Sequence, residues 1–201
     1  MSTATQSTVR PSTRTTPDTA RSPINGIDVA GLRQTIEAVR AAPAGGQTRW
    51  AVDTDWLGGT KSRTRVAGCE LGGQWVDRPF EFVADEPTQL LGTNTAPNPQ
   101  EYLLGALNAC MTVGYVAGAS LYGVKLESLR IRSEGSIDLR GFLGISRAVP
   151  AGYDKIRYTV HIRGDGTPEQ MRKIHELVMA TSPNRFNLAN PIALEAELVV
   201  E

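Results

Sequence analysis

Cysteine is scarce in this chain of 201 residues, which contains only Cys69 and Cys110. Two cysteines are too few for the disulfide framework that holds small secreted proteins together. We therefore expect a protein of the reducing cytoplasm, in which both side chains are thiols.

An excess of charge of either sign is also missing. Lys plus Arg and Asp plus Glu both number 21, so the formal net charge is zero. Nucleic acids and anionic membranes attract proteins that carry an excess of positive charge, and this chain has none. We therefore expect neither a nucleic acid nor a membrane as a partner.

Several patterns of catalytic and ligand-binding residues are absent from the sequence as well. It contains no Gly-rich phosphate loop, no Ser-His-Asp arrangement and no aromatic-basic surface of the kind that binds nucleic acid. The two histidines, His161 and His175, and the two cysteines are too scattered for a zinc site. We expect no metal and no cofactor.

The N-terminal segment differs in composition from the rest of the chain. Residues 1–24 are rich in Ser, Thr and Pro, which predicts a disordered tail. An Arg- and Ser-rich, acid-poor tail also has the composition of an organelle transit peptide, although it lacks amphipathic periodicity. Apolar residues then recur at helical spacing from Val29 to Val39, so we expect an N-terminal amphipathic helix and linker over 25–48. The main domain is expected over 49–201.

The main domain contains several stretches in which apolar and polar residues alternate. The first two stretches flank the turn LGGTK, which predicts a β-hairpin. On this pattern we expect strands over 49–56, 62–71, 74–85, 126–141, 155–164 and 192–200.

Two longer helices interrupt these strands. The apolar stretch Leu103–Gly123 approaches the length of a membrane span, but it is rich in small and polar residues and follows the helix start Asn98-Pro99. We interpret it as a fully buried core helix. A capping-box pattern at Thr167 opens a second helix that ends before Pro183. Runs of strands interrupted by single helices indicate an α+β fold with antiparallel pairing.

Two segments resemble the signatures of the OsmC/Ohr family. The segment NPQEYLLGALNAC ends in Cys110 and is similar to the proline, glutamate and aliphatic helix that lead into the family's peroxidatic cysteine. The segment TSPNRFNLANP, from Thr181 to Pro191, is similar to the second signature, in which the family usually has a cysteine followed by proline. The resemblance extends over roughly Arg49 to Glu201 in the order of elements.

The resemblance implies an OsmC-like fold in which antiparallel sheets wrap around two central helices of an intertwined homodimer. The helix expected over 25–48 is an extra N-terminal element. The resemblance also implies that the Cys110 thiolate attacks a small-molecule substrate, an organic hydroperoxide of fatty-acid type. An alcohol leaves and Cys110 becomes a sulfenic acid, which a second cysteine of the family resolves as a disulfide.

A reactive cysteine also needs a charged environment. The thiolate is the nucleophilic form, so a cation is expected near Cys110. In the family an arginine of the first hairpin is placed there, aided by a glutamate before the helix. The hairpin offers Lys61, Arg63 and Arg65, of which we favour Arg63. Glu101 is the candidate carboxylate.

Serine stands at position 182, where the family's two-cysteine members have the resolving cysteine. Because Ser182 cannot form a disulfide, three alternatives remain: an external thiol reduces the sulfenic acid, Cys69 resolves it, or the protein is not a peroxidase. We favour the one-cysteine cycle with an external thiol reductant. The rivals are different Cys110 chemistry on a reactive or sulfur-containing metabolite, and a small-molecule binding module without turnover.

Polar side chains gather in the two signature segments, which the family brings close together. They are candidates for binding a polar ligand, although capping of helices and turns is the usual role of asparagine. The candidate binding residues are Asn98, Asn108, Ser182, Asn184 and Asn187.

Overall fold

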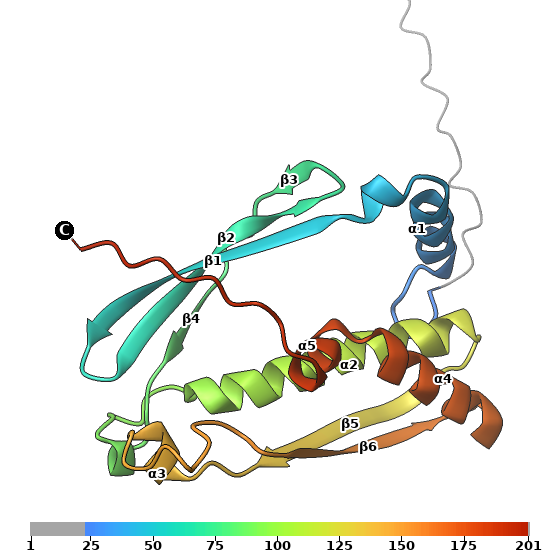
Figure 1. The fold of residues 1–201 in the computed structure, drawn as a ribbon. Helices are drawn as coiled ribbons and strands as arrows, with labels where there is room; N and C mark the ends of the chain where they lie inside the picture. Colours follow the sequence, from blue (N-terminus) through green and yellow to red (C-terminus); the bar gives the residue numbers. More distant parts are fainter. Residues whose placement is uncertain (1–22, 201) are drawn as a thin grey trace, which may run out of the picture.

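The structure, a computed structural model, describes residues 23–200 of the chain (Figure 1). Almost all of the predicted disordered tail lies outside the described residues, so its disorder stays a prediction. The elements in chain order are α1 (Val29–Ala41), η1 (Pro43–Gly46), β1 (Thr48–Gly58), β2 (Lys61–Leu71), β3 (Gln74–Val76), β4 (Glu81–Ala84), η2 (Thr88–Leu90), α2 (Pro99–Leu121), β5 (Leu126–Gly135), α3 (Leu139–Phe142), β6 (Ile156–Gly164), α4 (Pro168–Thr181) and α5 (Pro183–Ala189).

The hydrophobic core lies between the antiparallel pair β5–β6 and two helices. In Figure 1, α2 lies along this pair of strands and α4 lies beside α2. Both helices turn apolar side chains inward, and residues of β5 and β6 such as Ile131 and Val160 pack against them. The central cluster consists of Leu107, Met111, Tyr115, Ala119, Val124, Ile174 and Val178.

The helix α2 begins where its sequence predicts. The Asn98 side chain accepts a hydrogen bond from the Glu101 N–H at 2.9 Å, and the Glu101 carboxylate accepts from the Asn98 N–H at 2.8 Å. By length and composition alone α2 could cross a membrane, but one of its faces packs into the core. Within the described chain β5–β6 and the neighbouring helices cover only that face, so full burial of α2 stays a prediction that depends on the expected homodimer. Val113, on the uncovered face, is 70% exposed.

The first sheet contains the predicted hairpin β1–β2, to which β3 and β4 are added on β2. The single strand expected over 74–85 is wrong, because it is split into β3 and β4. The former pairs with Cys69–Leu71 and the latter with Ser62–Arg65. Pro79 lies between β3 and β4. Proline has no N–H to donate to a neighbouring strand, which favours a break in the strand at this position.

The first sheet has almost no core of its own. Cys69 is the only buried apolar side chain of these strands among the described residues, whereas Trp50, Trp75 and Trp56 are exposed. In Figure 1 the sheet stands apart from the layer formed by α2 and α4. The apolar side chains of this sheet are therefore mostly exposed in the single chain.

The strand predicted over 192–200 does not form in the single chain. The segment is irregular, and no described strand pairs with it. Its apolar side chains lie in solvent, with Leu194 88% exposed. The alternation typical of a strand is present, but backbone N–H and C=O groups need a partner strand, which residues 23–200 do not supply.

Two short helices, α3 and α5, are not predicted by the periodicity of the sequence. The strand expected over 126–141 ends at Gly135, because Asp138 accepts from the Arg140 N–H and begins α3. The second signature segment forms α5, with Ser182 and Pro183 at its start. Serine before a helix and proline at its first position are both typical helix starts.

A buried carboxylate organises the loop that precedes α2. Asp85 is fully buried and accepts hydrogen bonds from the hydroxyl groups of Thr60, Thr93 and Thr95. Backbone N–H groups of Glu86, Thr93 and Thr95 also donate to it. Burial by itself would raise the pKa of Asp85, but the hydrogen bonds, led by those of Thr93 and Thr95, hold this pKa well below its usual range.

The depressed pKa of Asp85 predicts a loss of stability in acid. A carboxyl group whose pKa is lower in the folded than in the unfolded state stabilises the fold above the unfolded value of about 4, and this contribution disappears as the pH falls towards the folded value. We expect Asp85→Asn to lower the melting temperature at neutral pH and to flatten its fall below about pH 4. Thermal unfolding followed by circular dichroism across this range measures both effects.

Asp53→Asn is the matched control, since Asp53 is exposed on β1 and has no hydrogen-bond partner among the described side chains. It should leave both the melting temperature and its pH dependence as in the wild type. A pH profile of Asp85→Asn that coincides with that of Asp53→Asn would contradict the role given to the buried carboxylate.

Candidate functional site

Cys110 lies on α2 where the helix meets the start of α5. Its Sγ atom is 3.4 Å from the Ser182 Oγ atom. The backbone N–H of Asn184 donates to the same sulfur at an N–S distance of 3.5 Å. The structure therefore brings the two signature segments together at the thiol.

The surroundings of the sulfur suit a nucleophilic thiolate. Cys110 is a free, half-buried cysteine. The Ser182 hydroxyl is buried against it, and both this O–H and the Asn184 N–H can donate to a negatively charged sulfur. The arrangement therefore places two potential hydrogen-bond donors against one thiol.

Side-chain hydrogen bonds hold the first turn of α5 in this position. The Asn184 Nδ2 atom donates to the Ala106 carbonyl of α2 at 2.9 Å. The Arg185 Nη1 atom donates to the Met179 carbonyl of α4 at 2.8 Å, and its Nε atom donates to the Tyr158 hydroxyl of β6 at 3.2 Å. Three neighbouring elements thus fix the donors that face Cys110.

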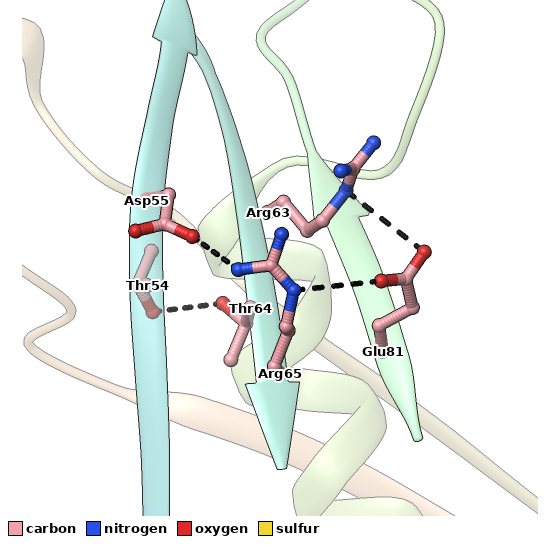
Figure 2. A network of polar contacts seen from close by, with 6 residues as sticks. All are labelled: Thr54, Asp55, Arg63, Thr64, Arg65 and Glu81. Atoms are coloured by element: carbon pink, nitrogen blue, oxygen red, sulfur yellow. Dashed lines mark hydrogen bonds and ion pairs between the residues drawn. The ribbon is translucent and has the colours of Figure 1, made fainter. Parts of the chain in front are cut away.

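The candidate cation of the hairpin has a different partner in the single chain. Figure 2 shows Arg63 of β2 beside Glu81 of β4, with 3.9 Å between the Arg63 Nε and Glu81 Oε1 atoms. That Nε atom is buried and has no hydrogen-bond partner among the described residues. Arg65 bridges Glu81 and Asp55, and Lys61 pairs with the hairpin turn at Gly58. The polar contacts of the hairpin arginines are therefore with carboxylates of their own sheet.

Glu101 and Asn98 form the capping box of α2 and do not reach Cys110 within one chain. A helix rises about 1.5 Å per residue, so the nine positions from Glu101 to Cys110 correspond to roughly 13 Å along the axis. Asn98 also donates to Glu86 at 3.3 Å. Both side chains thus have structural partners at the beginning of the helix.

The remaining predicted residues divide between structural contacts and solvent. Asn108 ties α2 to β5, because its Nδ2 atom donates to the Ile131 carbonyl at 3.4 Å and its Oδ1 atom accepts from Ser133 at 2.5 Å. Asn187 is exposed on α5. Cys69 on β2 is 1% exposed, and it lies between its strand neighbours Trp50 of β1 and Val76 of β3.

The structure also reveals polar residues that the sequence analysis missed. Arg185 directly follows Asn184 and is half-buried, and its position inside the second signature segment was the available signal. On the far side of Tyr158, the Tyr115 hydroxyl lies 2.5 Å from the Nδ1 atom of His175. Burial, together with the charge of Tyr158, raises the pKa of Tyr115 to about 12, so its hydroxyl keeps its proton at neutral pH.

Comparison with known protein families shows to which family this chain belongs. The sequence profile of the OsmC-like protein family matches residues 92–197, which is more than half of the chain. This chain belongs to the OsmC-like family. The matched range includes both Cys110 and Ser182, so the contact between them is a feature of an OsmC-like domain.

Solved structures of OsmC-like proteins share its fold. The OsmC-like protein of Mycoplasma pneumoniae aligns with a TM-score of 0.56 and 14% identity, over 70% of this chain and 87% of that chain. An OsmC-like protein of Vibrio cholerae aligns with a TM-score of 0.50 and 15% identity, over 69% of this chain and 92% of that chain. These likenesses confirm the predicted α+β fold with antiparallel sheets. No curated protein sequence matches the chain closely enough to count as a relative.

Proposed function

We propose that this OsmC-like protein reduces organic hydroperoxides, with Cys110 as the nucleophile and an external thiol as the reductant. The observation that supports this most directly is the contact of 3.4 Å between the Cys110 Sγ and Ser182 Oγ atoms. By the resemblance to the family's second signature, the Ser182 hydroxyl stands where two-cysteine members have a thiol. A sulfenic acid formed on Cys110 then has no neighbouring thiol among the described residues to resolve it.

The proposed cycle has two balanced stages. The Cys110 thiolate attacks the terminal oxygen of the hydroperoxide, so that an S–O bond forms while the O–O bond breaks. The alkoxide takes a proton from water and leaves as the alcohol, and the sulfur is oxidised to a sulfenic acid. One external thiol then releases water and forms a mixed disulfide, and a second thiol displaces Cys110 as its thiolate.

Turnover of cumene hydroperoxide tests this proposal. With dithiothreitol present, we expect continuous consumption of the hydroperoxide. Without a thiol, consumption of about one equivalent per chain should be followed only by the slower over-oxidation of Cys110 to sulfinic acid, because the sulfenic acid is not recycled. Consumption no faster than in buffer with dithiothreitol alone would overturn the proposal.

We further propose that the functional unit is an intertwined homodimer. Three surfaces of the single chain support it: the first sheet with its exposed tryptophans, the face of α2 around Val113, and the segment 192–200. The outer edge of β1 and both edges of the β5–β6 pair are open among the described strands, so a second copy can pair with them. Such an assembly would cover the apolar surfaces and complete each site with the partner's hairpin.

Sedimentation velocity tests the dimer at low micromolar concentration. We expect a single species with twice the mass of the chain. Leu194→Glu should shift the equilibrium towards the monomer, because it places a charge on a side chain that the partner would bury. Glu195→Gln on the same segment is the matched control and should stay dimeric. A monomeric wild type would contradict the proposal.

A further inference from the structure

A cavity of about 420 Å³ opens between α2, α5 and the start of β6. Apolar side chains form most of its wall, with Leu103 and Leu107 contributed by α2, Ile156 by β6 and Leu188 by α5. Binding sites for small molecules are typically concave, mostly apolar and equipped with a few polar groups that orient the ligand. This cavity has that character, because Arg185 also lines it.

The cavity adjoins the thiol site. Leu107 and Cys110 are three residues apart on α2 and therefore lie on neighbouring positions of the same helix face. On the other wall, Arg185 follows Asn184, whose N–H donates to the Cys110 sulfur. Cys110 itself does not line the cavity, so a molecule that occupies the cavity lies about one helical turn from the proposed nucleophile.

Arg185 carries a positive charge that the described chain does not neutralise. Its hydrogen bonds to Tyr158 and Met179 use the Nε atom and one N–H of Nη1. A guanidinium group has five N–H donors, and no described residue accepts from the Nη2 atom. The side chain is only half-buried, and Nη2 is not among the buried donors without a partner, so it is free to donate to an anion in the cavity.

The other charges at the cavity leave the balance positive. Lys155 adds a second positive charge to that of Arg185, and the negative charge of Asp154 offsets one of these two. A carboxylate matches the flat fork of a guanidinium group, which can donate two parallel hydrogen bonds to it. The apolar wall in turn suits a hydrocarbon chain attached to that carboxylate.

We infer that Arg185 determines substrate specificity by binding the carboxylate of an amphipathic acid whose apolar part occupies this cavity. The inference rests on the proposed function for the reaction that follows, since it assigns the class of molecule that is held near Cys110. The binding step itself does not depend on any chemistry of the thiol and can be measured alone.

Binding is measured on full-length Cys110→Ser protein with dansyl-labelled undecanoate and with its methyl ester. We expect the acid to bind more tightly than the ester, and Arg185→Gln to weaken binding of the acid by about tenfold or more. Lys155→Gln, which removes no side-chain hydrogen bond of the described fold, should also weaken binding of the acid. Arg130→Gln, on the exposed side of β5, is the matched control and should change neither affinity.

Turnover separates this inference from the proposed function. In protein with Cys110 intact, Arg185→Gln should raise the KM for linoleic acid hydroperoxide more than the KM for its methyl ester. The inference is supported if the protein binds the acid more tightly than the ester and both Arg185→Gln and Lys155→Gln weaken binding of the acid. If neither hydroperoxide is consumed, that result overturns the proposed function but not the inference. Equal binding of acid and ester, or unchanged binding of the acid in both variants, would overturn the inference whatever the turnover.

Discussion

Replacement of Cys110 by serine is expected to lower thiol-dependent reduction of cumene hydroperoxide by roughly a thousandfold or more, because it removes the nucleophile. The fold should be retained, since a hydroxyl group is close in size to a thiol and the site already tolerates polar neighbours at Ser182 and Asn184. The rate of hydroperoxide loss with dithiothreitol measures the effect, and the melting temperature checks the fold.

Cys69→Ser provides the matched control for this experiment. Cys69 is buried within the first sheet, where its neighbours are strand residues such as Trp50 and Val76. The variant should retain the wild-type rate per folded molecule even if its stability falls. Loss of activity in Cys69→Ser would contradict the role proposed for Cys110. Retention of activity in Cys110→Ser would contradict it as well.

Ser182→Cys is expected to convert the protein to a two-cysteine cycle. The contact of 3.4 Å between Cys110 and Ser182 is longer than a disulfide bond of about 2.0 Å, so only a small movement is needed. After one equivalent of hydroperoxide, the variant should form an internal disulfide that dithiothreitol reverses. With excess hydroperoxide it should resist inactivation, whereas wild-type Cys110 proceeds to sulfinic acid.

Thr181→Cys is the control for the position of the added thiol. The Thr181 hydroxyl donates to the Leu177 carbonyl within α4, away from the Cys110 contact. This variant should gain no internal disulfide and should be inactivated by excess hydroperoxide as fast as the wild type. Equal sensitivity of Ser182→Cys and Thr181→Cys would show that position 182 does not resolve Cys110.

The sequence predicts those elements of the fold that one chain completes by itself. The periodicity of α2 and α4 and the alternation of β5 and β6 describe faces that bury one another, so the structure matches the pattern. The same alternation over 192–200 fails, because a strand pattern indicates burial and does not say which chain supplies the partner. Coverage of α2 on all sides stays a prediction for the same reason, since the single chain leaves Val113 exposed.

The sequence likewise predicts some residues of the candidate site and misses others. The proximity of Cys110 and Ser182 was predictable because each lies in a recognisable segment. The roles of Arg63 and Glu101 rest on resemblance, and the single chain pairs these side chains with Glu81 and Asn98 instead. Arg185 lies inside the second signature segment, but only the structure shows its hydrogen bond to the Tyr158 hydroxyl, which distinguishes it from an exposed arginine.

Intact-mass spectrometry after one equivalent of cumene hydroperoxide, in the absence of any thiol, tests the central claim most directly. The proposed one-cysteine cycle predicts a gain of one oxygen atom per chain, located on Cys110, that dithiothreitol removes. A loss of two hydrogen atoms would instead show a disulfide with Cys69, and an unchanged mass would contradict the peroxidase function itself.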